Sequence, residues 1–191
     1  MTAAGLILAA GESQRMGFPK ALLRYRDQTF LDTLTALLAA RCSTVIVVLG
    51  ARAEEIRASA CRPATFVVNP EYARGMTTSL QCGLRSLPPD ADSVLLTLVD
   101  HPAAAPSTLD ALLAPDPPLL RVPRYRGKRG HPIWFSRQLA PEFLALPVEE
   151  AARDVVHRHR GDTEFLDLDD PGIVADIDTP EEYQALTGAR L

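Results

Sequence analysis

Four short runs of consecutive apolar residues, rich in β-branched side chains, recur in the first half of the chain. They cover residues 5–8, 45–49, 65–68 and 94–99. Uninterrupted apolar runs of this length are typical of strands that are buried on both faces of a parallel sheet. The pattern therefore predicts four strands of a mainly parallel sheet.

Apolar residues at helical spacing separate these runs. Between the first two runs, one buried helical face is predicted by Phe30, Leu31, Leu34, Leu37 and Leu38. A second helix is expected to bury Met76, Leu80, Leu84 and Leu87, and a third to cover residues 107–113 after Pro106. Strands that alternate with helices in this way indicate βαβ units and an α/β fold.

The second half of the chain is less regular. Two prolines after Asp116 interrupt any element there, and residues 124–129 predict a basic, glycine-containing loop. Residues 149–159 predict a helix and residues 173–177 a strand. Thr179, Pro180 and Glu182 then form a capping box that marks another helix start. Because no repeat or long linker divides the chain, we expect one domain over residues 1–191.

The composition is that of an ordinary globular protein. Of 191 residues, 47% are hydrophobic and 23% charged, which argues against disordered and fibrous classes. The net charge of −4 gives no electrostatic support to binding of nucleic acid or an anionic membrane. No basic segment precedes the apolar residues 3–10, so they do not predict a signal peptide. Cys42, Cys61 and Cys82 lack metal-binding spacing and predict free thiols, and we expect a cytoplasmic protein.

A polar loop follows the first predicted strand, at the edge where open α/β sheets bind ligands. It contains two glycines, Gly11 and Gly17, and two cations, Arg15 and Lys20. Backbone N–H groups, an arginine fork and a lysine ammonium can together bind a polyphosphate. The spacing matches neither a P-loop nor a dinucleotide-binding fingerprint. The alternative is an ordinary surface loop with solvated charges.

Acidic residues follow two other predicted strands. Asp100 ends the run 94–99, and a carboxylate there suits Mg²⁺, which takes one or two protein carboxylates and leaves its other positions to water and phosphate oxygens. A period of two in the strand predicted at 173–177 places Asp176 and Asp178 on one face. Each acid could instead only cap a turn or complement a helix dipole. Together with the cationic loop, the two strand-end acids Asp100 and Asp178 predict a metal and polyphosphate site.

Residues 69–79 follow the third predicted strand and lead into a helix. Gly75 and Ser79 are candidates there to contact a nucleotide through N–H and hydroxyl groups, and simple helix capping is the alternative. His101 and His131 do not predict histidine catalysis, because no recognisable serine or cysteine nucleophile and no H-x₃-H metal spacing accompany them.

Five motifs occur in order along the chain. They are L-A-A-G-E-S-Q-R-M-G-F-P-K at 8–20, N-P-E-Y-A-R-G-M-T-T-S-L-Q-C-G-L at 69–84, L-V-D-H-P at 98–102, G-H-P-I-W-F at 130–135 and D-I-D-T-P-E-E-Y at 176–183. This series resembles the MobA-like nucleotidyltransferases, and most closely their molybdenum cofactor cytidylyltransferase branch. The resemblance implies a Rossmann-like (GT-A-like) three-layer α/β sandwich with a nucleoside triphosphate and Mg²⁺ at the strand ends.

The resemblance also implies roles for residues at matching positions. Backbone contacts to base and phosphates are implied for four consecutive residues, Leu8, Ala9, Ala10 and Gly11. Arg15 and Lys20 would bind the triphosphate and, with Asp100, carry the catalytic role. Asp100 and Asp178 match the metal-binding carboxylates, and Ser79 would contact the base or ribose. The nucleotide-binding part would cover residues 1–105 and the acceptor side residues 106–191.

The implied reaction transfers CMP from CTP to the phosphate of a molybdopterin-type cofactor and releases pyrophosphate. CTP is expected rather than GTP because the first motif reads A-A-G and P-K, where the guanylyltransferase branch tends to A-G-G and D-K. Residues 121–129 would receive anionic groups of the acceptor, and a client molybdoenzyme is a further candidate partner. Two departures from the family pattern, the A-A-R at 151–153 and His101, lie where the acceptor would be recognised.

Two alternatives remain open from the sequence. One keeps the chemistry but uses GTP, or a sugar phosphate or other small phosphate as acceptor. The other is a non-catalytic protein that binds a nucleotide or cofactor and delivers it to a partner enzyme. Two metal-binding acids and Lys20 argue against the second, because pure binding does not require them.

Overall fold

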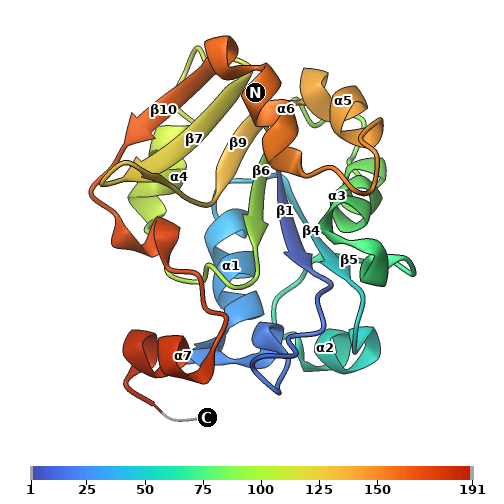
Figure 1. Ribbon diagram of the computed structural model, residues 1–191, viewed down its shortest axis with the longest axis vertical. Coiled ribbons are helices and arrows are strands. Elements are labelled where there is room, and N and C mark those ends of the chain that lie inside the picture. The colour runs from blue at the N-terminus through green and yellow to red at the C-terminus, as the bar shows by residue number, and fades with distance from the viewer. Residues whose placement is uncertain (1, 190–191) are drawn as a thin grey trace.

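The computed structural model describes residues 2–189, and most of its strands belong to one large sheet (Figure 1). The order is β10-β7-β9-β6-β1-β4-β5, and β8 pairs with β7. The bounds are β1 (Ala3–Ala9), β4 (Thr44–Leu49), β5 (Thr65–Val68), β6 (Ser93–Leu98), β7 (Leu120–Tyr125), β8 (Lys128–Arg129), β9 (Ile133–Ser136) and β10 (Thr163–Asp167). Strands β8 and β9 run antiparallel to their neighbours, and the other pairs are parallel. The mainly parallel sheet is confirmed.

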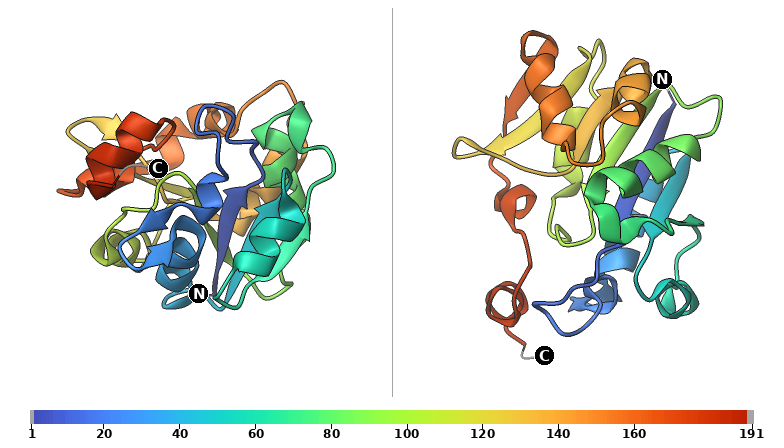
Figure 2. Two further views of the ribbon diagram at one scale, coloured as in Figure 1. Left: turned by 90° about the horizontal axis from the view of Figure 1, so that it is seen from below. Right: turned by 45° about the vertical axis from the view of Figure 1, so that its right-hand side comes forward.

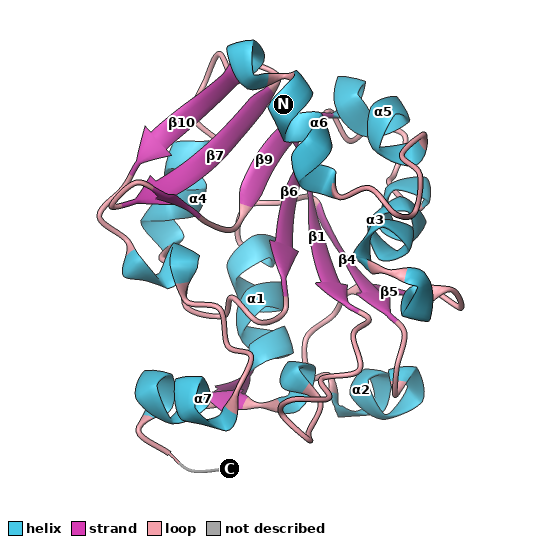
Figure 3. Ribbon diagram, viewed as in Figure 1, coloured by secondary structure: helices cyan, strands magenta, loops and turns pink. Residues whose placement is uncertain are grey.

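Helices cover both faces of this sheet, as Figures 2 and 3 show. On one face lie α1 (Phe30–Ala39), α2 (Ala53–Ser59) and α4 (Pro106–Leu112), and on the other α3 (Met76–Arg85), α5 (Ala140–Leu144) and α6 (Ala152–Arg158). Each face has its own apolar cluster, with Phe30 and Trp134 buried in the first and Phe135 and Phe143 in the second. The expected three-layer α/β sandwich is therefore confirmed. Among residues 2–189, no helix is long and apolar enough to cross a membrane.

The neighbouring strands β1, β4 and β6 end at the same edge of the sheet. Leu8 of β1 pairs with Val48 on one side and with Leu98 on the other, so the three strands finish in register. Below this edge in Figure 1 lie α7 (Pro180–Thr187) and a small hairpin of β2 (Arg24–Tyr25) and β3 (Gln28–Thr29). The Tyr183 hydroxyl of α7 donates to the carbonyl of Arg24 at 3.0 Å and joins the two elements.

Most elements expected in the first half are confirmed, and α7 begins at its expected capping box. The Thr179 hydroxyl accepts the N–H of Glu182, and the Glu182 carboxylate accepts the N–H groups of Asp178 and Thr179. The expected helix at 149–159 is shorter, because Asp154 accepts the N–H of Ala151 and thereby caps a helix that begins at Ala152. The cap on α7 places Asp178 at the strand-end edge.

The strand expected at 173–177 is wrong. Pro171–Val174 form a 3₁₀ turn, and residues 175–178 belong to no strand. The buried Asp170 carboxylate accepts the N–H groups of Gly172 and Ala105, and it thereby fixes the turn against the segment before α4. A Cβ on Gly172 would lie 2.0 Å from the carbonyl oxygen of Ala103. The period-two argument for Asp176 and Asp178 therefore does not apply.

The basic loop expected at 124–129 is also wrong, since these residues form the ends of β7 and β8 and the turn between them. Arg121, expected to bind the acceptor, is only 5% exposed. Its guanidinium pairs with Glu164 and donates to carbonyls of residues 112, 114 and 115. Arg124 pairs with Asp167 across the strands. These two arginines join elements of the protein to one another.

Candidate active site

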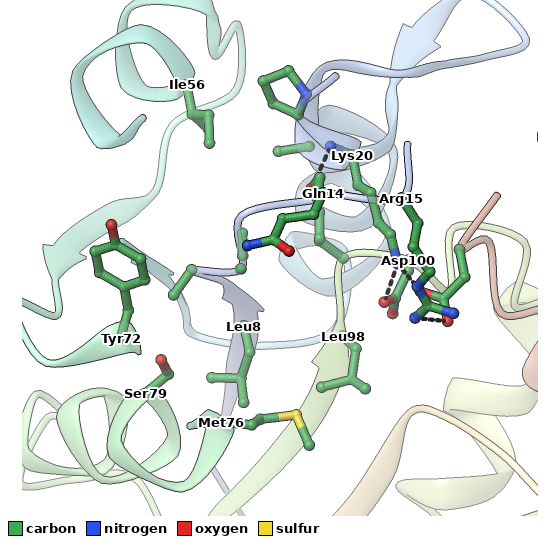
Figure 4. Close-up of a pocket in the computed structure, with 18 residues that line it drawn as sticks. Leu8, Gln14, Arg15, Lys20, Ile56, Tyr72, Met76, Ser79, Leu98 and Asp100 are labelled. Atoms are coloured by element: carbon green, nitrogen blue, oxygen red, sulfur yellow. Dashed lines mark hydrogen bonds and ion pairs between the residues drawn. The ribbon is translucent and has the colours of Figure 1, made fainter. Parts of the chain in front are cut away.

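A cavity of about 340 Å³ lies where β1 and β6 end, and we call it the strand-end pocket (Figure 4). Its walls include the loop after β1, part of α2, the start of α3 and the segment after β6. The expected site residues that line it are Leu8, Ala9, Ala10, Gly11, Arg15, Lys20, Ser79, Asp100 and Asp178. Gly75 directly precedes α3 at a positive φ of 125° and is not among the lining residues.

The loop after β1 is folded on itself, which fixes the position of Lys20. The carbonyl of Ser13 accepts the N–H groups of Met16 and Gly17, and the Ser13 hydroxyl accepts the N–H of Lys20. Met16 is 5% exposed and anchors the loop in the core. Gly17 has a positive φ of 68°, which an ordinary side chain disfavours. These contacts hold the loop in one conformation, although most of its side chains are exposed.

Lys20 connects two acids that are far apart in the sequence. Its ammonium contacts Asp100 Oδ2 at 3.0 Å and also forms a hydrogen bond with Asp178 Oδ1. Arg15 donates to the other oxygen of Asp178 and is itself largely exposed. Asp100 and Asp178, 78 positions apart in the sequence, therefore lie within reach of one cation.

These contacts shift the pKa values of all three groups. Burial lowers the pKa of Lys20, but the charge of Asp100 and the hydrogen bonds that Lys20 donates to both acids outweigh burial and leave the pKa raised. Burial raises the pKa of Asp100, whereas hydrogen bonding to His101 and the charge of Lys20 bring it down to about 2. The hydrogen bond from Lys20 lowers the pKa of Asp178. Lysine and both carboxylates are thus charged near neutral pH.

Asp176 and His101 form a second cluster around Asp100. One ligand atom of each residue lies within 4.8 Å of the others, and His101 Nδ1 is 3.0 Å from Asp100 Oδ1. Burial raises the pKa of Asp176, and the charge of Asp100 raises it further. Two carboxylates that repel one another beside an imidazole are a donor set that fits a divalent cation. The expected metal pair, Asp100 and Asp178, stays a prediction, and in this structure Lys20 bridges it.

The far end of the strand-end pocket presents hydroxyl and apolar groups. Buried Asn69 donates to Ser79 Oγ at 3.0 Å and to Thr78 Oγ1 at 2.8 Å. Figure 4 shows Tyr72 and Ser79 on the side of the pocket opposite Asp100. A Cβ on Gly50 would lie 2.6 Å from both the Ala10 carbonyl oxygen and Tyr72, so only glycine allows this close approach. This end of the pocket offers hydroxyl and apolar contacts, and the opposite end offers the Lys20 ammonium.

The family comparison agrees with this geometry. A family model described as the MobA-like NTP transferase domain matches residues 5–163. The chain belongs to this family. The matched range includes the loop after β1, Ser79 and Asp100, whereas Asp176 and Asp178 lie beyond it. The site therefore belongs to a MobA-like nucleotidyltransferase, and residues beyond the matched range help to form it.

Two curated relatives match nearly the whole chain. The nicotine blue oxidoreductase of Paenarthrobacter nicotinovorans is 32% identical, with 95% of each chain covered. The molybdenum cofactor cytidylyltransferase of Escherichia coli K12 is 30% identical, with 93% of this chain and 92% of that protein covered. Because two differently named proteins are similar to this chain to the same degree, family membership alone does not determine the acceptor.

The solved structures include a similar fold with a metal. Rv0371c from Mycobacterium tuberculosis H37Rv is 34% identical, with a TM-score of 0.88 and with 99% of this chain and 98% of that chain covered. Another structure of Rv0371c, with a TM-score of 0.82, 31% identity and coverage of 99% and 100%, is a complex with manganese. That complex, together with the acidic cluster, suggests a divalent metal for this MobA-like chain.

Sequence reasoning missed several residues of the site. Four residues that the sequence did not single out as site residues also line the strand-end pocket: Gln14, Ile56, Tyr72 and Met76. His101 directly follows Asp100, the predicted metal ligand, and that adjacency was the signal that could have included it. The family motifs matched Asp100 and Asp178 and left the role of Asp176 open, and only the three-dimensional fold brings Asp176 to Asp100.

Proposed function

We propose that this MobA-like chain transfers CMP from CTP to the phosphate of a molybdopterin-type cofactor and releases pyrophosphate. The observation that carries the proposal is the position of Lys20, whose partly buried ammonium lies between Asp100 and Asp178 beside a loop that contains two glycines. A cation fixed in this way at the strand ends is suited to hold phosphate oxygens.

The nucleotide would lie along the strand-end pocket. The backbone of Leu8 to Gly11 would face the base and phosphates, and Ser79 would donate its hydroxyl to the base or ribose. Lys20 and Arg15 would bind the triphosphate and stabilise the charge that develops on it. An acceptor phosphate oxygen would attack the α-phosphorus of CTP. The bond between the α-phosphorus and the oxygen that bridges it to the β-phosphorus would break, and pyrophosphate would leave with the bonding electrons. The acceptor phosphate is already ionised near neutral pH, so this attack requires no general base.

Asp100, Asp176 and His101 would hold the divalent cation, with Asp178 within reach of Lys20. Bound there, Mg²⁺ would supply Lewis-acid stabilisation of phosphate charge. The chain's own contribution is to place its carboxylates and Lys20 side by side at the edge where the strands end, so that phosphates and cation would meet at one point. The cytidylyltransferase motifs and the relative of that name support CTP and molybdopterin.

The test is pyrophosphate release from CTP, molybdopterin and Mg²⁺ by the wild type and by Asp100→Ala. We expect release by the wild type and a loss of about 100-fold in Asp100→Ala, because the variant lacks a ligand of the cation that would stabilise charge on the reacting phosphates. Asp169→Ala is the matched control, because Asp169 is exposed and lies outside the strand-end pocket. Equal rates in wild type and Asp100→Ala would reject the catalytic role.

Parallel reactions address the alternatives. GTP in place of CTP tests the base, and sugar phosphates in place of molybdopterin test the acceptor. If CTP binds but no acceptor gives pyrophosphate, the chain is a binding or delivery protein and the proposed transfer is wrong.

A further inference from the structure

The hairpin of β7 and β8 is a basic segment outside the strand-end pocket. We call its residues 124–129, which read R-Y-R-G-K-R, the basic hairpin. It projects from the body of the molecule in the right-hand view of Figure 2 (yellow). Its last four residues are exposed, and none of its residues lines the strand-end pocket. Its charges therefore face solvent away from Lys20 and the acids.

Three of the four cations in the basic hairpin have no carboxylate partner. Asp167 pairs with Arg124 at 2.6 Å, whereas Arg126, Lys128 and Arg129 form no ion pair in the described part of the chain. The register also places Arg129 directly opposite Arg124, where like charges repel. In a chain of net charge −4, this is a local concentration of positive charge that a bound anion would relieve.

The turn of the basic hairpin holds an arginine in a disfavoured conformation. Its two central residues, Arg126 and Gly127, have positive φ angles of 49° and 78°. Two-residue turns with both φ angles positive favour Asn-Gly, because most side chains crowd the backbone there. The fold alone would therefore favour asparagine at position 126. A strained residue at an exposed tip points to a role for its side chain outside the fold.

The cations of the basic hairpin lie on both of its faces and at its tip. Paired residues share a face of a hairpin and neighbours alternate, so Lys128 lies on the face of Tyr125 and Arg129 on the opposite face. A flexible segment can contact both faces and Arg126 at the tip, whereas a flat membrane surface meets only one side. The large hydrophobic side chains that are exposed also lie outside the hairpin, at Phe18, Val68 and Met76.

The aromatic rings of this region are already covered by guanidinium groups. Arg126 lies 5.1 Å from the ring centroid of Tyr125, and Arg124 and Arg129 lie 5.2 Å and 4.9 Å from that of Phe165. Sites for single-stranded nucleic acid stack bases on aromatic faces of this kind. Three free cations are also fewer than the about six to ten phosphate contacts that DNA-binding proteins make. The pattern therefore favours carboxylates over nucleic acid.

We infer that the basic hairpin docks a flexible acidic segment of a partner protein, whose carboxylates pair with Arg126, Lys128 and Arg129. The inference does not depend on the proposed function, which uses none of these three side chains. Because the hairpin is exposed and its cations are not tied to the fold, pairing should be sensitive to salt.

A fluorescein-labelled polyglutamate peptide of ten residues is the probe, and fluorescence anisotropy in low salt measures its binding. We expect Arg126→Asn and Lys128→Gln each to weaken binding about threefold and the double variant about tenfold, because each change removes one charge contact. The matched control is Arg57→Gln with Arg62→Gln, which removes two exposed arginines outside the hairpin and should stay within about twofold of the wild type.

The variant Arg126→Asn also separates binding from folding. Because Asn-Gly suits this turn, its melting temperature by circular dichroism should equal or exceed that of the wild type while peptide binding falls. If Arg126 served only the fold, the substitution would lower the melting temperature and leave peptide binding unchanged, and the inference would be wrong.

Parallel measurements test the other occupants. A ten-nucleotide single-stranded DNA and phosphatidylserine vesicles should bind more weakly than the peptide at the same salt, and sedimentation velocity should give the same mass for the wild type and the double hairpin variant. Four results would overturn the inference: no peptide binding by the wild type in low salt, unchanged binding in the double variant, tighter hairpin-dependent binding of DNA or vesicles, or a dimer that the double variant abolishes.

Discussion

Lys20 is the residue on which the charge balance of the strand-end pocket depends. Its side chain is 11% exposed and contacts two carboxylates, whereas an ordinary surface lysine is solvated. The loop hydrogen bonds through Ser13 hold its backbone in place. These contacts distinguish a site residue from a surface charge.

We expect Lys20→Ala to lower the turnover number for pyrophosphate release by about 100-fold, because the variant lacks a cation that stabilises transition-state charge. Steady-state kinetics with saturating CTP measure this. Lys128→Ala, at an exposed hairpin position, should keep near wild-type turnover. If the turnover number of Lys20→Ala falls by less than threefold, Lys20 is only a structural ion-pair partner.

The cysteines differ in reactivity for a physical reason. Burial raises the pKa of the Cys42 thiol to about 12, whereas Cys61 is exposed. Because the thiolate is the reactive form, iodoacetamide at pH 8 should modify Cys61 first and Cys42 only when the protein unfolds. Peptide mass spectrometry over time, with and without denaturant, checks the order. Equal rates at the two positions in native protein would contradict the burial of Cys42.

At the scale of elements, the 3₁₀ turn Pro171–Val174 and the cap of α7 carry two acids to the strand ends. The turn is fixed by Asp170, which accepts N–H groups from residues 105 and 172 and the hydroxyl proton of Thr108. The carbonyl of Asp100 accepts the N–H of Ile177 at 3.0 Å, which holds the intervening segment beside β6. The acidic site therefore depends on backbone contacts remote from it.

Gly172→Ala should destabilise the protein by about 3 kcal/mol, because the added Cβ would collide with backbone atoms that cannot move aside easily. Urea unfolding followed by circular dichroism gives the free energy. Gly161→Ala is the matched control, because a Cβ there meets nothing within 4 Å. Similar midpoints for the two variants would show that the turn accommodates a side chain.

These elements also show what the sequence could predict. Local patterns predicted four strands and one helix. Strands β1, β4, β5 and β6 are mostly apolar along their length, and helix α1 has one clearly apolar face. Strand β7 was missed because Arg121 and Pro123 interrupt its apolar run, and the partners that bury Arg121 are distant in sequence. Similarly, Arg15, Lys20 and Asp100 were found from motifs, whereas the partnership of Asp176 with Asp100 depends on the 3₁₀ turn.

At the scale of the whole molecule, the acidic cluster joins the segment after β6 to the C-terminal segment before α7. A cation bound to both would stabilise the folded chain, because the unfolded chain does not bring these ligands together. The raised pKa of Asp176 has the opposite effect on the protein alone. Its ionised carboxylate is less favourable in the folded than in the unfolded chain, so folding stability falls as pH rises through the pKa of Asp176.

Mn²⁺ or Mg²⁺ should therefore stabilise the folded wild type and raise its melting temperature. At a metal concentration of 100 times the dissociation constant, the gain in free energy of unfolding is about 2.7 kcal/mol. Asp176→Asn should melt at or above the wild-type temperature in EDTA at pH 7 and should lose the metal-dependent increase. Thermal melts with and without metal measure both effects, with Asp169→Asn as control. An undiminished metal-dependent increase in Asp176→Asn would exclude Asp176 as a ligand.

The ammonium of Lys20 between two carboxylates also affects how the substrates depend on one another. A triphosphate that binds this ammonium must compete with Asp100 and Asp178, and a divalent ion that binds Asp100 relieves part of that competition. By thermodynamic reciprocity, each ligand then strengthens the affinity for the other by the same factor. Nucleotide and metal should accordingly enter as a synergistic pair, and either alone should bind weakly.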